Sequence, residues 1–140
     1  MDWVLLAGRI LFVTIFAPAA LNHVRNRKLM AGYAASKGLP FAALAVPGTG
    51  VLLAFASVLV LLGAWVDLAG LLLAGFLVPT ALTMHPFWRS EEPMERMTET
   101  IHFQKDVSLA GAALALFYLF NQFGPAIGIT VGDGRLFGAL

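Results

Sequence analysis

The sequence predicts an all-α membrane protein, a four-transmembrane-helix bundle with an amphipathic cytoplasmic helix before the fourth span. Residues of the set AVILMFWYC make up 59% of the 140 positions, whereas soluble domains contain roughly 45–50% even when glycine is counted. Charged residues account for 12%, which is about half their usual share. The mean hydropathy is +0.83. A soluble chain of this size has too few charges here to cover its surface, so a membrane location follows.

Four hydrophobic windows are long enough to cross the hydrocarbon core of a bilayer, which takes about 20 helical residues. They cover residues 3–21, 41–64, 68–84 and 103–123. We expect one bundle over residues 1–140 with no second domain. No basic residue precedes the first window, so we expect this segment to be retained and not cleaved as a signal peptide.

The two longer connections also carry helical patterns. Residues 29–35 form a short amphipathic piece, after which Gly38 suits a helix end. Further along, Ser90 is expected to cap a second helix whose first turn is acidic. Met94, Met97 and Ile101 then form one apolar stripe. This stripe predicts the amphipathic helix that leads into the fourth span.

Basic residues predict the orientation, because Lys and Arg concentrate in cytoplasmic loops. The two long connections would face the cytoplasm, and both termini would lie on the opposite side with Arg135 as their only basic residue. Each tryptophan falls at a predicted span end, where indoles favour the membrane interface. The seven basic residues of the cytoplasmic side are Arg25, Arg27, Lys28, Lys37, Arg89, Arg96 and Lys105.

Small residues four positions apart suggest where the spans pack, because such pairs let helix backbones approach closely. The third span carries Gly70 with Ala74. The fourth carries two such pairs, Ser108 with Ala112 and Gly111 with Ala115. Ordinary membrane composition explains any one pair equally well.

Composition excludes several functional classes. The net charge of +1 provides no basic excess for binding nucleic acid. The chain has no cysteine, so disulfides, thiolate metal sites and iron–sulfur clusters are excluded. No hydrolase triad, P-loop or dinucleotide fingerprint is present.

Arg9 lies inside the first span, where a charge costs about 2.5–3.5 kcal/mol near the membrane centre. Its side chain either extends to the nearby interface or faces the bundle interior, where it would pair with an acid or a ligand head group. Asp67 and Asp133 are expected on the same side of the membrane. Arg9 and His23 are 14 residues apart, so they share one helix face with Phe16.

Three histidines mark the cytoplasmic ends of the spans: His23, His85 and His102, with Lys105 one turn further on. They are consistent with plain boundary residues, with a polar pocket for a quinone or lipid head group, with a metal or haem site, or with a proton relay. Glu99 and His102 have an ExxH spacing, but a di-iron bundle needs two such pairs. We therefore predict no metal site.

These residues together resemble the DoxX family of small bacterial membrane proteins. Position 106 is Asp where the family usually has Asn. The resemblance implies a four-helix protein of the bacterial inner membrane, and in a bacterium the orientation expected from the basic residues places both termini in the periplasm. It supports the fold more strongly than any reaction. The resemblance is carried by Arg9, by residues 21–23 with Lys28, by residues 33–40, by His-Pro-Phe-Trp at 85–88, by residues 101–111 and by residues 132–135.

The family takes its name from a subunit of a thiosulfate:quinone oxidoreductase, and other members are linked with oxidative-stress complexes. The first hypothesis is therefore a redox-associated protein that holds a quinone-like or lipid-like ligand and acts with a partner oxidoreductase subunit. The chain would be at most an accessory subunit of an enzyme, and a quinone is the cofactor it would take. The expected ligand-binding residues are Arg9, His23, His85, His102 and Lys105.

Two alternatives remain open from the sequence. One is a noncatalytic membrane scaffold or assembly factor that docks partners through the amphipathic segment Glu91–Ile101, with its stripe of Met94, Met97 and Ile101, and through the small-residue faces of the spans. The other is a small-solute transporter, which would need a homo-oligomer because four short spans leave a narrow path in a monomer.

Overall fold

The computed structural model describes residues 2–138, and these residues form helices, turns and loops with no strand among them. Four helical segments are long and apolar enough to cross a membrane, as predicted. The chain is therefore a multi-pass membrane protein. The elements in order are α1 (Asp2–Val13), α2 (Phe16–Arg25), α3 (Arg27–Ser36), α4 (Ala42–Leu62), α5 (Val66–Met84), η1 (Phe87–Arg89), α6 (Pro93–Phe123) and η2 (Gly124–Ala126).

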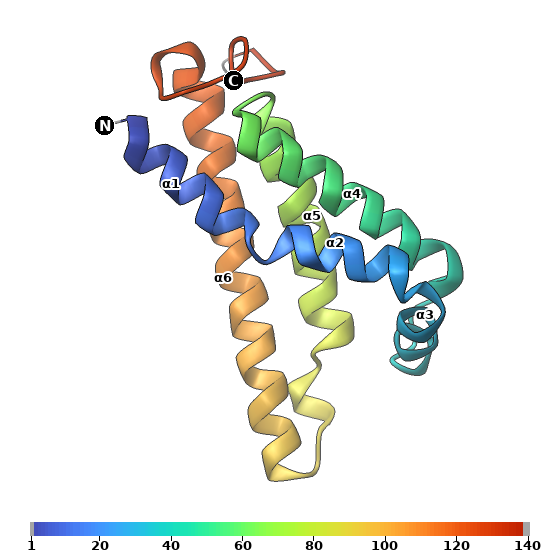
Figure 1. The fold of residues 1–140 in the computed structure, drawn as a ribbon. Coiled ribbons are helices and arrows are strands. Elements are labelled where there is room, and N and C mark those ends of the chain that lie inside the picture. Colours follow the sequence, from blue (N-terminus) through green and yellow to red (C-terminus); the bar gives the residue numbers. More distant parts are fainter. Residues whose placement is uncertain (1, 139–140) are drawn as a thin grey trace.

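Helices α5 and α6 pack against each other along their length, and α4 packs on α5. Helices α2 and α3 also pack against α4. Asp2 and the tail at 124–138 lie at one end of the bundle, where α6 ends, and α6 begins at the opposite end (Figure 1). We call the first the terminal end; it holds the α4–α5 turn at residues 63–65 and the tail at 124–138. The opposite end, with α3, η1 and the start of α6, is the loop end.

The first span is broken, although a single helix over residues 3–21 was predicted. Helix α1 ends at Val13 and α2 begins at Phe16. Pro18 explains the break, because it has no N–H to donate to the Thr14 carbonyl and its ring crowds that carbonyl. The predicted shared face survives the break: Arg9 and Phe16 are buried, and His23 is half-buried.

The amphipathic helix and the fourth span form one continuous helix of 31 residues, α6. Its length of about 46 Å exceeds a hydrocarbon core of about 30 Å, so one end projects beyond the bilayer. The predicted cap at Ser90 is wrong: the Glu92 side chain accepts a hydrogen bond from the Glu95 N–H, and Pro93 follows at the first helical position. The predicted stripe stays on the surface, with Met94, Met97 and Ile101 exposed by 68%, 61% and 53%.

Small residues mediate the α5–α6 contact at only one of the predicted pairs. A Cβ atom added at Gly70 would lie 2.6 Å from the Ala113 carbonyl oxygen, so Gly70 permits a close backbone approach. The two pairs predicted on α6 are wrong, since all four of their residues are exposed. The buried face of α6 instead follows the spacing of Glu99, Asp106, Ala110, Ala113 and Phe120. This face is buried because it is the one that α5 covers.

Candidate functional site

A cavity of about 650 Å³ lies between α3, α4 and α5 toward the loop end. Its wall is mostly apolar, with Leu52, Leu72 and Phe76 among the residues that line it. Such a volume falls within the range of small-molecule sites, roughly 300–1,000 Å³. Polar side chains enter the wall at six positions: His23, Tyr33, Thr49, Thr80, Thr83 and His85.

His23 reaches the cavity from the last turn of α2. Its Nδ1 lies 2.9 Å from the Thr49 hydroxyl oxygen and 3.2 Å from the Val46 carbonyl oxygen, both on α4. The Phe76 ring on α5 meets the imidazole edge-on at 6.3 Å between centroids. These contacts fix the ring between two helices that both border the cavity.

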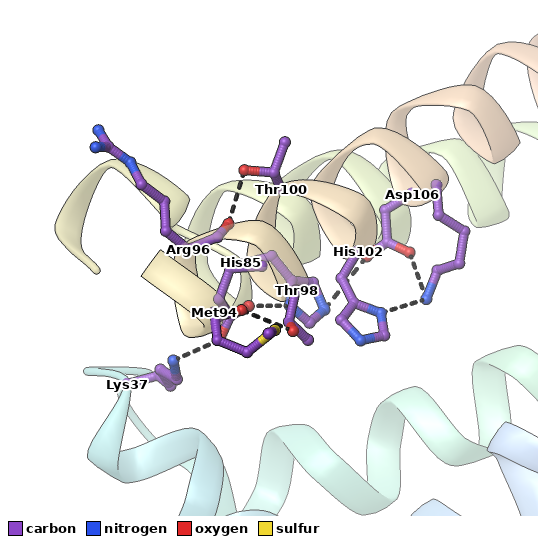
Figure 2. A network of polar contacts seen from close by, with 10 residues as sticks. Lys37, His85, Met94, Arg96, Thr98, Thr100, His102 and Asp106 are labelled. Atoms are coloured by element: carbon purple, nitrogen blue, oxygen red, sulfur yellow. Dashed lines mark hydrogen bonds and ion pairs between the residues drawn. The ribbon is translucent and has the colours of Figure 1, made fainter. Parts of the chain in front are cut away.

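Glu99 on α6 joins two other borders of the cavity. Its carboxylate accepts hydrogen bonds from Lys37 Nζ at 3.0 Å and from His85 Nδ1 at 2.7 Å. Lys37 follows α3 and His85 follows α5, so one carboxylate connects the ends of both helices. We call Lys37, His85, Glu99, His102 and Asp106 the polar cluster. Figure 2 shows Lys37 and His85 in it, with His102 and Asp106 further along the same helix as Glu99.

The carboxylate of Glu99 raises the pKa of the Lys37 ammonium above its ordinary value, mainly through this hydrogen bond. Lys37 therefore stays charged throughout the neutral range. Glu99 is only 8% exposed, and a buried carboxylate is stable when it is paired and hydrogen-bonded. Both oxygens of the Glu99 carboxylate therefore have a hydrogen-bond partner, next to a cavity whose wall is mostly apolar.

The His85 ring stacks on the His102 ring with 5.0 Å between centroids. Lys105 Nζ lies 3.4 Å from both His102 Nδ1 and a carboxylate oxygen of Asp106. The other Asp106 oxygen is 3.8 Å from His85 Nε2, which is beyond hydrogen-bonding distance. His102 therefore contacts His85 directly, Lys105 contacts His102 and Asp106, and neither His102 nor Lys105 lines the cavity.

Arg9 faces the bundle interior, where it is 1% exposed. The predicted pairing with an acid is wrong. One guanidinium nitrogen donates a hydrogen bond of 2.6 Å to the Ile129 carbonyl oxygen, and the Phe120 ring lies 5.9 Å away. Arg9 thus sits at the terminal end, away from the cavity, and contacts the tail.

Asp67 holds the same tail by different contacts. Its two carboxylate oxygens accept hydrogen bonds from the backbone N–H groups of Leu136 and Phe137, at 2.8 and 2.9 Å. Asp67 is therefore committed to backbone groups of the tail, whereas Arg9 binds a tail carbonyl. The tail closes the terminal end over the buried guanidinium.

The structure thus divides the five predicted ligand residues into three groups. His23 and His85 line the cavity, His102 and Lys105 contact His85 or its neighbour Asp106, and Arg9 lies at the opposite end. Lys37, Glu99 and Asp106 are cluster members that sequence reasoning missed. The spacing of 99, 102 and 106 places three polar residues on one helix face, which was the available signal. Within residues 2–138, no group of three His, Cys, Asp or Glu residues is arranged to hold a metal ion.

Comparison with known proteins identifies the family. The family model described as DoxX matches residues 4–86, which cover α1 to α5 and therefore the side chains that line the cavity. The match ends before α6, so Glu99 and His102 lie outside it. The chain matches none of the curated proteins and none of the solved structures with which it was compared. Because the matched segment is more than half of the chain, the protein belongs to the DoxX family.

Proposed function

We propose that this DoxX protein works in the bacterial inner membrane and holds a quinone-like or lipid-like ligand in the cavity between α3, α4 and α5. The observation that carries the proposal is the cavity itself, about 650 Å³ of mostly apolar space with two imidazoles in its wall. Apolar walls with a few placed polar groups are typical of sites that bind membrane-soluble molecules. In this proposal residues 1–140 act as a single unit.

The predicted site residues then have different roles. His23 and His85 contact the polar part of the ligand. Glu99 positions His85 through the hydrogen bond to Nδ1, His102 stacks on His85, and Lys105 binds His102 and Asp106. Arg9 supports the terminal end of the bundle and does not touch the ligand.

A quinone reaction moves protons as well as electrons, and imidazoles are suitable proton carriers near neutral pH. The described residues offer His23 and His85 for this purpose. We assign the electrons to a partner oxidoreductase subunit, which makes this chain an accessory subunit and not a complete enzyme.

A substitution that fills the cavity tests the proposal. Gly75 lines the cavity, and a Cβ added there meets no atom within 4 Å. Gly75→Leu therefore occupies the cavity without displacing the backbone. Gly111→Leu is the matched control, because Gly111 is also a mid-helix glycine with open space at Cβ but does not line the cavity.

Native mass spectrometry of gently extracted protein provides the measurement. Wild type and Gly111→Leu should carry the same small molecule, whose mass identifies it as a quinone or a lipid, and Gly75→Leu should lose it. Wild-type protein with no bound small molecule, or an unchanged ligand in Gly75→Leu, would contradict a ligand site in this cavity.

A further inference from the structure

Most polar groups of the cavity wall offer a ligand hydrogen-bond acceptors and no donors, and His23 shows this most clearly. Its Nδ1 lies 3.2 Å from the Val46 carbonyl oxygen, an atom that can only accept a hydrogen bond. The Thr49 hydroxyl, the other neighbour of Nδ1, also donates to this carbonyl, so both neighbours of Nδ1 are acceptors and we assign the proton to Nδ1. In the neutral ring Nε2 then holds a lone pair, so His23 offers the cavity an acceptor.

The threonines of the wall also commit their protons to the backbone. Thr49 donates to the Val46 carbonyl at 2.9 Å, Thr80 to the Phe76 carbonyl at 2.7 Å and Thr83 to the Pro79 carbonyl at 2.8 Å. Each hydroxyl donates its only proton in a hydrogen bond to a carbonyl of its own helix. What remains for a ligand is the oxygen lone pairs.

Two further groups of the wall also offer no hydrogen-bond donor to a ligand. His85 donates from Nδ1 to the Glu99 carboxylate, and its Nε2 lies 3.8 Å from an Asp106 carboxylate oxygen on α6, so neither ring nitrogen supplies the cavity with a donor. Pro79 has no N–H, so the Gly75 carbonyl on the cavity wall loses its usual helical donor. The Tyr33 hydroxyl is a donor, but it lies on α3 at one side of a wall that otherwise presents acceptors.

We propose that the cavity selects an uncharged apolar ligand that donates hydrogen bonds, namely a membrane-soluble molecule with hydroxyl groups, such as a hydroquinone. An oxidised quinone has only carbonyl acceptors and would face these lone pairs unfavourably. The described cavity wall contains no Lys or Arg, so it gives no cation for an anionic lipid head group. The inference rests on the proposed function and names the chemical class of its ligand.

The test compares three ligands with the same ring and tail on purified full-length protein: decylubiquinol, decylubiquinone and the dimethyl ether of the quinol. Two hydrogen bonds worth about 1 kcal/mol each make the quinol bind at least about tenfold more tightly than the quinone. The dimethyl ether has no hydroxyl proton and should bind no better than the quinone. Equal or tighter binding of the quinone overturns the inference but leaves the proposed function intact.

Dioleoylglycerol, a neutral lipid with one hydroxyl, distinguishes the other source of the same chemistry. Binding of this lipid together with exclusion of all three ring compounds supports the hydroxyl rule with a lipid as the ligand. If none of the four molecules binds, both the inference and the proposed function are overturned.

Two substitutions and one NMR spectrum test whether the cavity wall causes the preference for the quinol. His23→Phe should reduce the quinol preference about fivefold or more, and Thr80→Val should reduce it by less. Thr98→Val is the matched control, because Thr98 makes the same hydroxyl bond to the carbonyl four residues back but does not line the cavity. Nitrogen-15 NMR of the ligand-free protein at a pH where His23 is neutral should show its proton on Nδ1. A proton on Nε2 overturns the inference whether or not any variant folds.

Discussion

Arg9 is a buried cation that lies against a glycine. Gly63, in the α4–α5 turn, has a φ of +69°, and a Cβ there would collide with the Arg9 guanidinium and lie 2.9 Å from the Ile129 carbonyl oxygen. Position 63 therefore requires glycine for two reasons: its backbone is left-handed, and a side chain would not fit there. The glycine makes room for the hydrogen bond between Arg9 and the tail.

We predict that Gly63→Ala destabilises the protein more than Gly132→Ala. Gly132 has nearly the same φ, +68°, but a Cβ there meets nothing within 4 Å. Gly132→Ala thus carries only the backbone cost of roughly 1–2 kcal/mol. Gly63→Ala should add about 1–3 kcal/mol for the crowded guanidinium. Thermal unfolding in detergent measures the difference, and equal melting temperatures would show that Arg9 moves aside freely.

The partner of Arg9 was not predictable from local sequence. An arginine inside a span indicates a buried partner, and Asp67 is an acid at the expected membrane level. The carboxylate instead accepts hydrogen bonds from the Leu136 and Phe137 amides, and a carbonyl oxygen 120 residues from Arg9 accepts a hydrogen bond from its guanidinium. Irregular tail segments carry no periodic pattern, so their backbone groups are invisible to pattern reasoning.

At the scale of elements, Lys37 connects the α3 region to the long helix α6. Helix α3 packs mainly on α4, and the Lys37–Glu99 ion pair adds a contact across the loop end of the cavity. We predict that Lys37→Met increases hydrogen exchange of the α3 backbone several-fold, because one of its attachments is lost. Lys28→Met is the control, since Lys28 is an exposed lysine of α3. The same increase in both variants would mean that the ion pair does not restrain α3.

The same pair predicts how stability depends on alkaline pH. Because Glu99 raises the pKa of Lys37, the pair contributes fully below the unfolded value of 10.5 and is lost as pH rises through the higher folded value. Lys37→Met lacks this group, so its stability should fall less than that of wild type between pH 10 and 12. Parallel pH profiles of melting temperature for the two proteins would contradict the assigned role.

Element boundaries show which parts of the fold the pattern determines. Windows of apolar residues located all four spans, because the length of a bilayer-crossing helix is set by membrane thickness. The pattern missed that α6 is continuous, since an amphipathic stretch and an apolar stretch have different compositions but compatible backbones. It also placed Pro18 within a span without placing the break, which falls at the carbonyl four residues earlier.

The whole molecule explains why the site was only partly predictable. Placing His23, His85 and His102 at one membrane level follows from alternating spans, and the stacked rings of His85 and His102 agree with it. Which ring enters the cavity depends on helix rotation, which the sequence leaves undetermined when a span is apolar all round. Glu99 was recognised only as half of a metal spacing, although its carboxylate joins α3 to α5.

The orientation of the bundle in the membrane can be tested directly, because the chain contains no cysteine. Arg27 lies at the loop end and Asp133 at the terminal end, and both side chains are exposed. Seven basic residues belong to the loop-end segments or their edges, namely Arg25, Arg27, Lys28, Lys37, Arg89, Arg96 and Lys105, whereas Arg135 alone belongs to the tail at the terminal end. Loops rich in Lys and Arg stay in the cytoplasm, which predicts periplasmic termini.

In intact bacteria whose outer membrane is permeable to small reagents, a membrane-impermeant maleimide should label Asp133→Cys and leave Arg27→Cys unlabelled. After the inner membrane is permeabilised, both variants should react, which shows that each thiol is accessible. Removing Arg27 leaves six basic residues on its side, so the substitution itself does not reverse the charge bias. Labelling of Arg27→Cys alone in intact cells would invert the proposed topology, and it would place the polar cluster on the periplasmic side.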